Sequence, residues 1–129
     1  MDEHREVNVT PDRYVTYRYA GASGDFNPIH LDDEFARSVG LPGRILHGLW
    51  TMAQVARAQT EAAGGPESLR SIEVQFRGMA LPEREITITS TVKAHRDGEV
   101  VVRCDAVQDG KRIIRGGRAV LRDPDSTRS

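Results

Sequence analysis

The sequence predicts an α+β domain in which an antiparallel sheet lies against one long helix. Two observations predict this fold class, a change in the spacing of apolar residues and a pair of turn dipeptides. Apolar residues recur at helical spacing over residues 48–63, whereas from residue 72 onward they alternate with polar residues, as in a strand. Asp-Gly dipeptides at 97–98 and 109–110 separate strand-like runs, which is the usual sequence of a tight hairpin turn.

The first twenty residues predict one strand and one helix. Residues 6–10 alternate polar and apolar side chains, which is typical of a half-buried strand. Thr10 and Pro11 have the residue types of an N-cap and a first helical position, so we expect a helix to begin there. The helix is expected to run to about Tyr19 or Ala20, with Tyr14, Val15 and Tyr19 facing inward. The glycines of residues 21–24 are expected to end the helix.

The middle of the chain predicts a short helix and then the long one. Asp32 or Asp33 can cap the short helix, which Gly40 would close. The long helix is rich in alanine, which suggests close approach by another element. Its expected inward face consists of apolar residues at helical spacing: Leu49, Met52, Ala53, Ala56 and Ala63.

The second half of the chain predicts an antiparallel meander of four strands. Ile72, Val74 and Phe76 alternate with polar residues and form the first. The other three are predicted from their alternation and their Asp-Gly turns, at residues 86–96, 99–108 and 111–122.

Length and composition indicate a single domain over residues 1–122, followed by a flexible tail of residues 123–129. With a net charge of −1 and interspersed signs, we expect no nucleic-acid partner. Residues 1–5 are polar, unlike a signal peptide, and no apolar run approaches the ~20 residues of a membrane span, so we expect a cytoplasmic protein. The single cysteine, Cys104, is interpreted as a small strand residue.

One motif has the residue types of an acid–base site. Asp25 and His30 are five positions apart, and Pro28 between them prevents a regular helix, so a turn can direct both side chains to one point. Asn27 is left to fix the loop backbone or to hold a water. A histidine that titrates near neutral pH beside a carboxylate suits acid–base work on a bound water.

The string Ser23-Gly24-Asp25, Asn27-Pro28-Ile29-His30 and, further on, His47-Gly48 resembles the signature of the MaoC-like dehydratases and (R)-specific enoyl-CoA hydratases. The resemblance implies a hot-dog fold, in which the sheet curls around the long helix. It also implies addition of water to a trans-2-enoyl thioester to give the (3R)-hydroxyacyl thioester, or the reverse reaction. Asp25 and His30 would then be catalytic.

Further site residues follow from the long helix and from the resemblance. The N–H of Gly48 lies at the expected helix N-terminus, where it could bind a thioester oxygen as negative charge develops there. We expect Ser23, Asn27 and His47 to support the site, and Trp50 and Met52 are candidates for the acyl pocket, although both also fit a plain core. No metal is expected, because these residues supply few good ligands.

The expected substrate is an acyl-CoA or acyl-carrier-protein thioester, with no other cofactor than the coenzyme A or phosphopantetheine of that substrate. Candidates to meet its phosphates are four arginines: Arg44, Arg77, Arg112 and Arg115. The sheet is expected to have open edges, and relatives build the acyl pocket between two subunits, so we expect a homodimer, or a heterodimer with a second hot-dog subunit.

The sequence leaves three alternative functions to weigh against hydration. The chain could be the catalytic subunit of a heterodimeric 3-hydroxyacyl-thioester dehydratase. An acyl-CoA thioesterase is disfavoured, because one common form has its catalytic carboxylate on the long helix, where the only acid is Glu61 near the far end. A non-catalytic subunit that binds acyl thioesters would be expected to lack Asp25 or His30, and this chain has both.

Overall fold

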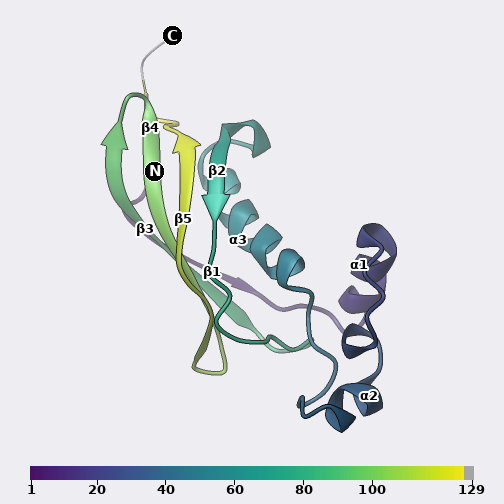
Figure 1. Cartoon of the computed structure of the whole chain (residues 1–129). Coiled ribbons are helices and arrows are strands. Elements are labelled where there is room, and N and C mark those ends of the chain that lie inside the picture. The colour runs from purple at the N-terminus through teal and green to yellow at the C-terminus, as the bar shows by residue number, and fades with distance from the viewer. Residues whose placement is uncertain (127–129) are drawn as a thin grey trace.

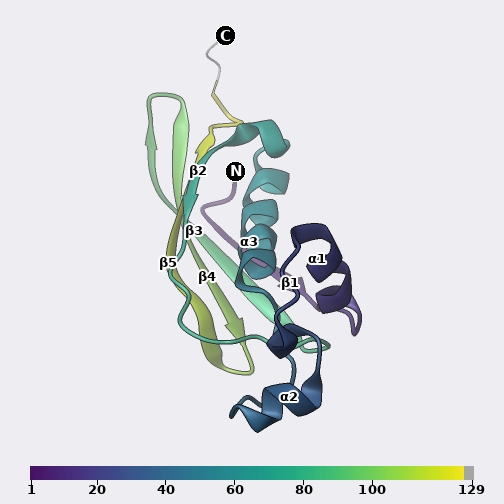
Figure 2. The same cartoon turned by 45° about the vertical axis from the view of Figure 1, so that its right-hand side comes forward.

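Five strands form one antiparallel sheet, and the longest helix packs along one face of it in a computed structural model that describes residues 1–126 (Figures 1 and 2). The strand order is β1-β3-β4-β5-β2, and every neighbouring pair is antiparallel. The elements in chain order are β1 (His4–Val9), α1 (Val15–Ser23), η1 (Pro28–His30), α2 (Asp33–Ser38), α3 (Gly48–Ala62), η2 (Pro66–Ser68), β2 (Leu69–Glu73), β3 (Ile86–Arg96), β4 (Glu99–Gln108) and β5 (Lys111–Arg122). This is the hot-dog arrangement that the sequence predicts.

The hairpins β3–β4 and β4–β5 confirm the three predicted strands at 86–96, 99–108 and 111–122. Asp97 and Gly98 both have positive φ, and so do Asp109 and Gly110, as tight hairpin turns require. Alternate side chains of these strands are buried under α3, and Cys104 is fully buried among them. The interpretation of Cys104 as a packed strand residue is therefore confirmed.

The position of β2 differs from the prediction. It ends at Glu73, and it pairs with β5 at the far edge of the sheet instead of joining β3 in a meander. Beyond it the chain stays beside β5 through a single bridge between Phe76 and Ile114. Alternation in the sequence identifies the buried face of a strand but not its neighbour, which is why the prediction was wrong.

The buried face of α3 also differs from the prediction. Its fully covered positions include Val55 and Gln59, whereas Leu49 is 63% exposed and Ala53 is exposed. Gln59 can be buried because its amide accepts a hydrogen bond from Arg5 (2.6 Å) and donates one to a serine of β3 (2.7 Å). Of the five apolar positions that the prediction placed inward, only Ala63 is buried, at the end of the helix. The other four are half-buried or exposed.

Helix α1 begins later and ends later than predicted. Pro11 is buried and its carbonyl accepts the N–H of Glu83 (2.7 Å), so the chain is fixed before the helix can start at Val15. Of the three residues expected to face inward, Val15 is buried and Tyr19 is half-buried, whereas Tyr14 is 58% exposed. The helix continues past the first glycine to Ser23. The predicted cap of α2 is confirmed, since the Asp32 carboxylate accepts the N–H of Phe35 (3.1 Å).

Both views place α1 and α2 near the N-terminal end of α3 (Figures 1 and 2). Arg44 joins them, because its guanidinium donates to the Asp33 carboxylate of α2 (2.9 Å) and to the carbonyl of Arg13, which precedes α1. At the other end of the sheet, the Asp123 N–H donates to Gly98 (2.8 Å), so the start of the predicted tail is hydrogen-bonded to the β3–β4 turn. The rest of that tail, residues 127–129, lies outside the described residues.

Candidate active site

The loop between α1 and η1 is shaped by its own short side chains. The helix closes at Gly24, whose φ of 79° lies in the left-handed region that favours glycine. The Ser23 hydroxyl donates to the carbonyl of Tyr19 (2.7 Å) and accepts the N–H of Asp25 (3.2 Å). The Ser23 hydroxyl at the helix end therefore holds the backbone of Asp25.

Asn27 continues this turn through its side chain and through its backbone N–H. Its side-chain oxygen accepts the N–H of Ile29 (3.1 Å), which caps η1, and its own N–H donates to the Asp25 carboxylate (3.2 Å). One carboxylate oxygen of Asp25 is thereby held in place. The other, Oδ2, lies 3.8 Å from Nε2 of His30.

His30 is fixed by a hydrogen bond on its far side. The side chain is buried, with 7% of the residue exposed, and Nδ1 lies 2.8 Å from the carbonyl of Ile45, to which it donates. With Nδ1 engaged in this way, Nε2 is the ring nitrogen that faces the Asp25 carboxylate. A separation of 3.8 Å is too long for a direct hydrogen bond, and one oxygen atom can contact both groups across it.

His47 supports both members of the pair. Its ring stacks on His30 with centroids 3.9 Å apart, and its Nε2 donates to the backbone carbonyl of Asp25 (3.0 Å). The Tyr19 ring covers its other flank at 4.9 Å. His47 is 3% exposed, and among the described residues nothing hydrogen-bonds its Nδ1. These contacts fit the positioning role expected of it.

Gly48 is the first residue of α3, and its N–H donates no hydrogen bond within residues 1–126. It lines a cavity of about 160 Å³ together with His30. A Cβ at this position would lie 3.3 Å from the ring of Phe76, so a side chain would crowd the cavity. The free N–H of Gly48 and the imidazole of His30 therefore belong to residues that line the same small cavity.

The cavity has partly different walls from those predicted. Neither Trp50 nor Met52 lines it; Trp50 instead packs against the core. Eight of its lining residues were not assigned to the site by the sequence analysis: Ile45, Leu46, Thr51, Phe76, Gly78, Met79, Ala80 and Ile113. Thr51 was predictable, because it lies one helical turn after Gly48 on the same side of the helix.

The donor atoms of Asp25, His30 and His47 all lie within 4.8 Å of one another. Such a trio could hold a metal ion. The two imidazoles are stacked with 21° between their planes, so their in-plane lone pairs run side by side and do not converge. The arrangement suits contact with a water better than shared ligation of a metal.

The chain matches known proteins along most of its length. The model of the MaoC-like domain family matches residues 1–111. The chain is 39% identical over 101 residues to the peroxisomal hydratase-dehydrogenase-epimerase of Saccharomyces cerevisiae, which covers 78% of this chain and only 10% of that protein. The chain likewise spans a small part of the fatty acid synthase beta subunits that it matches.

Solved structures show the same fold. The (R)-hydratase of A. caviae involved in PHA biosynthesis superimposes with a TM-score of 0.84 at 21% identity, over 94% of each chain. The ChsH1-ChsH2 complex of Mycobacterium tuberculosis matches with a TM-score of 0.82 at 22% identity, over 92% of this chain and 93% of that one. With a family model covering most of its residues and a fold shared with these proteins, the chain belongs to the MaoC-like dehydratase family.

Proposed function

We propose that this protein adds water to trans-2-enoyl thioesters and removes it from 3-hydroxyacyl thioesters. One observation carries the proposal: Asp25 Oδ2 and His30 Nε2 lie 3.8 Å apart beside a cavity that the unbonded N–H of Gly48 also meets. His30 and Gly48 line this cavity, and Asp25 lies beside His30. An acid–base pair and an amide donor grouped in this way are what hydration of a conjugated thioester requires.

The reaction follows from these positions. The thioester oxygen accepts the Gly48 N–H at the start of α3, where the helix dipole adds positive charge, and this polarises the double bond. A water between Asp25 and His30 gives one proton to the pair while its oxygen bonds to the β carbon. The α carbon then takes a proton from the pair, and the double bond becomes single. Asp25 and His30 act as one coupled unit in these transfers.

The (3R) configuration of the product rests on the relatives. The fold neighbour from A. caviae is an (R)-hydratase, and the Saccharomyces cerevisiae relative has hydratase in its name. We extend that configuration to this chain because its motif from Ser23 to His30 matches the signature of those enzymes. Coenzyme A or phosphopantetheine would enter only as part of the substrate, without another cofactor.

We propose a homodimer as the working assembly. Phe76, which lines the cavity, and Leu49, next to Gly48, are both exposed, and on the same helix Ala53 is exposed and Met52 and Ala56 are half-buried. Such a surface fits a second copy. A heterodimer with a second hot-dog subunit is the alternative, by analogy with the ChsH1-ChsH2 complex. No helix among residues 1–126 is long and apolar enough to cross a membrane. A cytoplasmic location is a separate proposal, which rests on the free thiol of Cys104, as is usual in a reducing compartment.

The test is hydration of crotonyl-CoA and longer enoyl-CoA thioesters by the purified chain, followed by loss of the enoyl-thioester absorbance. Chiral analysis of the product should give the (3R) alcohol. Release of free thiol without loss of the double bond would instead indicate a thioesterase. That outcome is not expected, because the only acid of α3, Glu61, is paired with Arg57 (2.8 Å) at the end of the helix away from Gly48.

A further inference from the structure

A second, larger cavity of about 600 Å³ lies next to the one at the catalytic pair. The loop at residues 40–42, the segment 77–81 and the β4–β5 turn enclose it. Four of its lining residues are cationic and one is acidic: Arg77, Arg84, Lys111, Arg112 and Asp109. A chain whose net charge is −1 thus concentrates positive charge in one cleft, which we call the cationic cleft.

Most of this positive charge is not neutralised. Asp109 is paired with Arg84 (2.8 Å), and Arg77 donates to the neutral side-chain oxygen of Gln75 (2.7 Å). Lys111 and Arg112 are exposed and make no hydrogen bond or ion pair through their side chains within residues 1–126, although the charge of Arg112 helps to lower the pKa of the Asp105 carboxyl on β4. Unpaired cations around a hollow are the usual surroundings of a bound phosphate.

The cationic cleft adjoins the catalytic cavity. Gly78, Met79 and Ile113 line both. Gly78 lies so close to the β5 backbone that a Cβ there would be 3.1 Å from the carbonyl of Arg112, so only glycine fits without a shift. Met79 is half exposed and flexible, which lets it adapt to a chain passing between the two spaces.

We propose that the cationic cleft binds the phosphate of the group that carries the acyl chain, with Lys111 and Arg112 as its principal contacts. This inference rests on the proposed function. The thioester of coenzyme A or of a carrier protein is joined to its phosphate by a pantetheine arm, so the phosphate must bind at a distance from the reacting carbons and in a connected space. The cleft meets both conditions.

Only two of the four arginines that were predicted to meet the phosphates line the cationic cleft. Arg77 and Arg112 line the cleft, whereas Arg115 does not. Arg44 is occupied, because it binds Asp33, the carbonyl of Arg13 and the ring of Tyr17 (5.2 Å). Lys111, next to Arg112 at the start of β5, also lines the cleft and was not among the candidates, which were all arginines.

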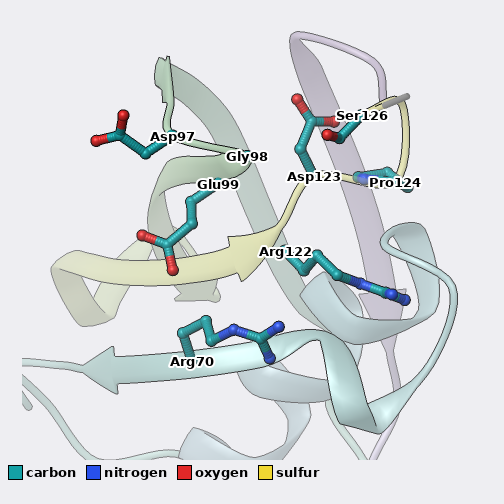
Figure 3. Close-up of a pocket in the computed structure, with 8 residues that line it drawn as sticks. All are labelled: Arg70, Asp97, Gly98, Glu99, Arg122, Asp123, Pro124 and Ser126. Carbon is teal, nitrogen blue, oxygen red and sulfur yellow. The ribbon is translucent and has the colours of Figure 1, made fainter. Parts of the chain in front are cut away.

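Another polar hollow supplies a matched control. Figure 3 shows Arg70 on β2 and Arg122 at the end of β5, lining a cavity of about 400 Å³ at the opposite end of the sheet from the cationic cleft. Three carboxylates share that cavity: Asp97, Glu99 and Asp123. Its mixed charge and its distance from the catalytic pair make it a poor phosphate site, and its two arginines can be removed without touching the cleft.

The experiment compares a Lys111→Ala/Arg112→Ala variant with an Arg70→Ala/Arg122→Ala variant, which removes equal charge elsewhere. Crotonyl groups are presented on coenzyme A, on phosphopantetheine and on N-acetylcysteamine, which has no phosphate. We expect the first variant to lose at least ~10-fold in kcat/KM on the phosphate-bearing thioesters, mainly through KM, because hydrogen bonds to charged groups are lost. Its activity on the N-acetylcysteamine thioester and all activities of the control should stay near parental values.

The three substrates identify the source of the phosphate. Equal losses on coenzyme A and phosphopantetheine assign the cleft to the phosphate of the arm, and a loss on coenzyme A alone assigns it to the nucleotide phosphates. Equal losses on all three substrates, or on none, overturn the proposal. Calorimetric binding of coenzyme A itself to both variants separates this inference from catalysis: a protein without hydratase activity would refute the proposed function, while weaker binding in the first variant alone would still support the cleft.

Discussion

Asp25→Asn and His30→Ala should separate catalysis from stability, because the two side chains are held so differently. Loss of either group removes one member of the acid–base pair, so we expect kcat to fall at least ~100-fold in each variant. Asparagine at position 25 keeps an oxygen to accept the N–H of Asn27, and the Asp25 side chain is 53% exposed. Its free energy of unfolding should therefore change by no more than about 0.5 kcal/mol.

His30→Ala should lower the free energy of unfolding as well as the activity, unlike Asp25→Asn. Alanine leaves the carbonyl of Ile45 without its 2.8 Å hydrogen bond and leaves the His47 ring without its stacking partner. An unpaired buried acceptor costs about 1–3 kcal/mol, and the cavity adds to this, so we expect a destabilisation of about 2–4 kcal/mol. His30→Asn is the matched control, because its side-chain amide can donate to Ile45 from nearly the position of Nδ1 while offering nothing in place of Nε2.

Urea unfolding and enoyl-CoA hydration would be measured on the same preparations. Asp25→Asn should be stable and nearly inactive, His30→Ala less stable and nearly inactive, and His30→Asn should recover much of the stability without activity. Near-parental turnover in either Asp25→Asn or His30→Asn would refute the assigned roles. Full stability of His30→Ala would show that the bond to Ile45 contributes little.

Three further outcomes are expected. Gly48→Ala should lower kcat/KM at least ~10-fold with little change in urea midpoint, since its methyl group would lie 3.3 Å from the half-exposed ring of Phe76. If this crowding is the cause, replacing the ring by a smaller side chain in a Gly48→Ala/Phe76→Leu variant should restore part of the activity. Burial raises the pKa of the Cys104 thiol to about 12, so the native protein should react with a thiol reagent at least ~100-fold more slowly than the urea-unfolded chain at mildly alkaline pH. Hydrogen bonds to the carboxylates of Asp123 and, second, Glu3 raise the pKa of His95 above 6.5. The stability lost in His95→Gln should therefore be greatest below pH 6.5 and vanish as pH rises through the raised pKa of the folded state. Urea midpoints of both proteins across this pH range test it, and a difference that stays constant with pH would contradict it.

The sequence predicted the elements that local residues determine. The three long strands follow from alternation and their Asp-Gly turns, and α3 follows from helical spacing that begins at Gly48. The start of α1 was wrong because Pro11 is buried against a loop seventy residues away, a contact that no local pattern contains. The inward face of α3 was wrong for a related reason, since Gln59 is buried only because residues of β1 and β3 satisfy its amide.

Because local pattern contains no distant contacts, the catalytic pair could be predicted from the sequence, but the cationic cleft could not. Asp25 and His30 lie within one loop, so their spacing and Pro28 were enough to predict that they meet. The cationic cleft joins Arg77 to Lys111 and Arg112, and it exists only because the chain after β2 runs beside β5 at the far edge of the sheet. Chemistry on the acyl group is thus encoded in a short motif, whereas recognition of the group that carries it depends on sheet topology. It follows that chains sharing this motif can differ in the carrier they accept, according to which charges their own β4–β5 turn presents.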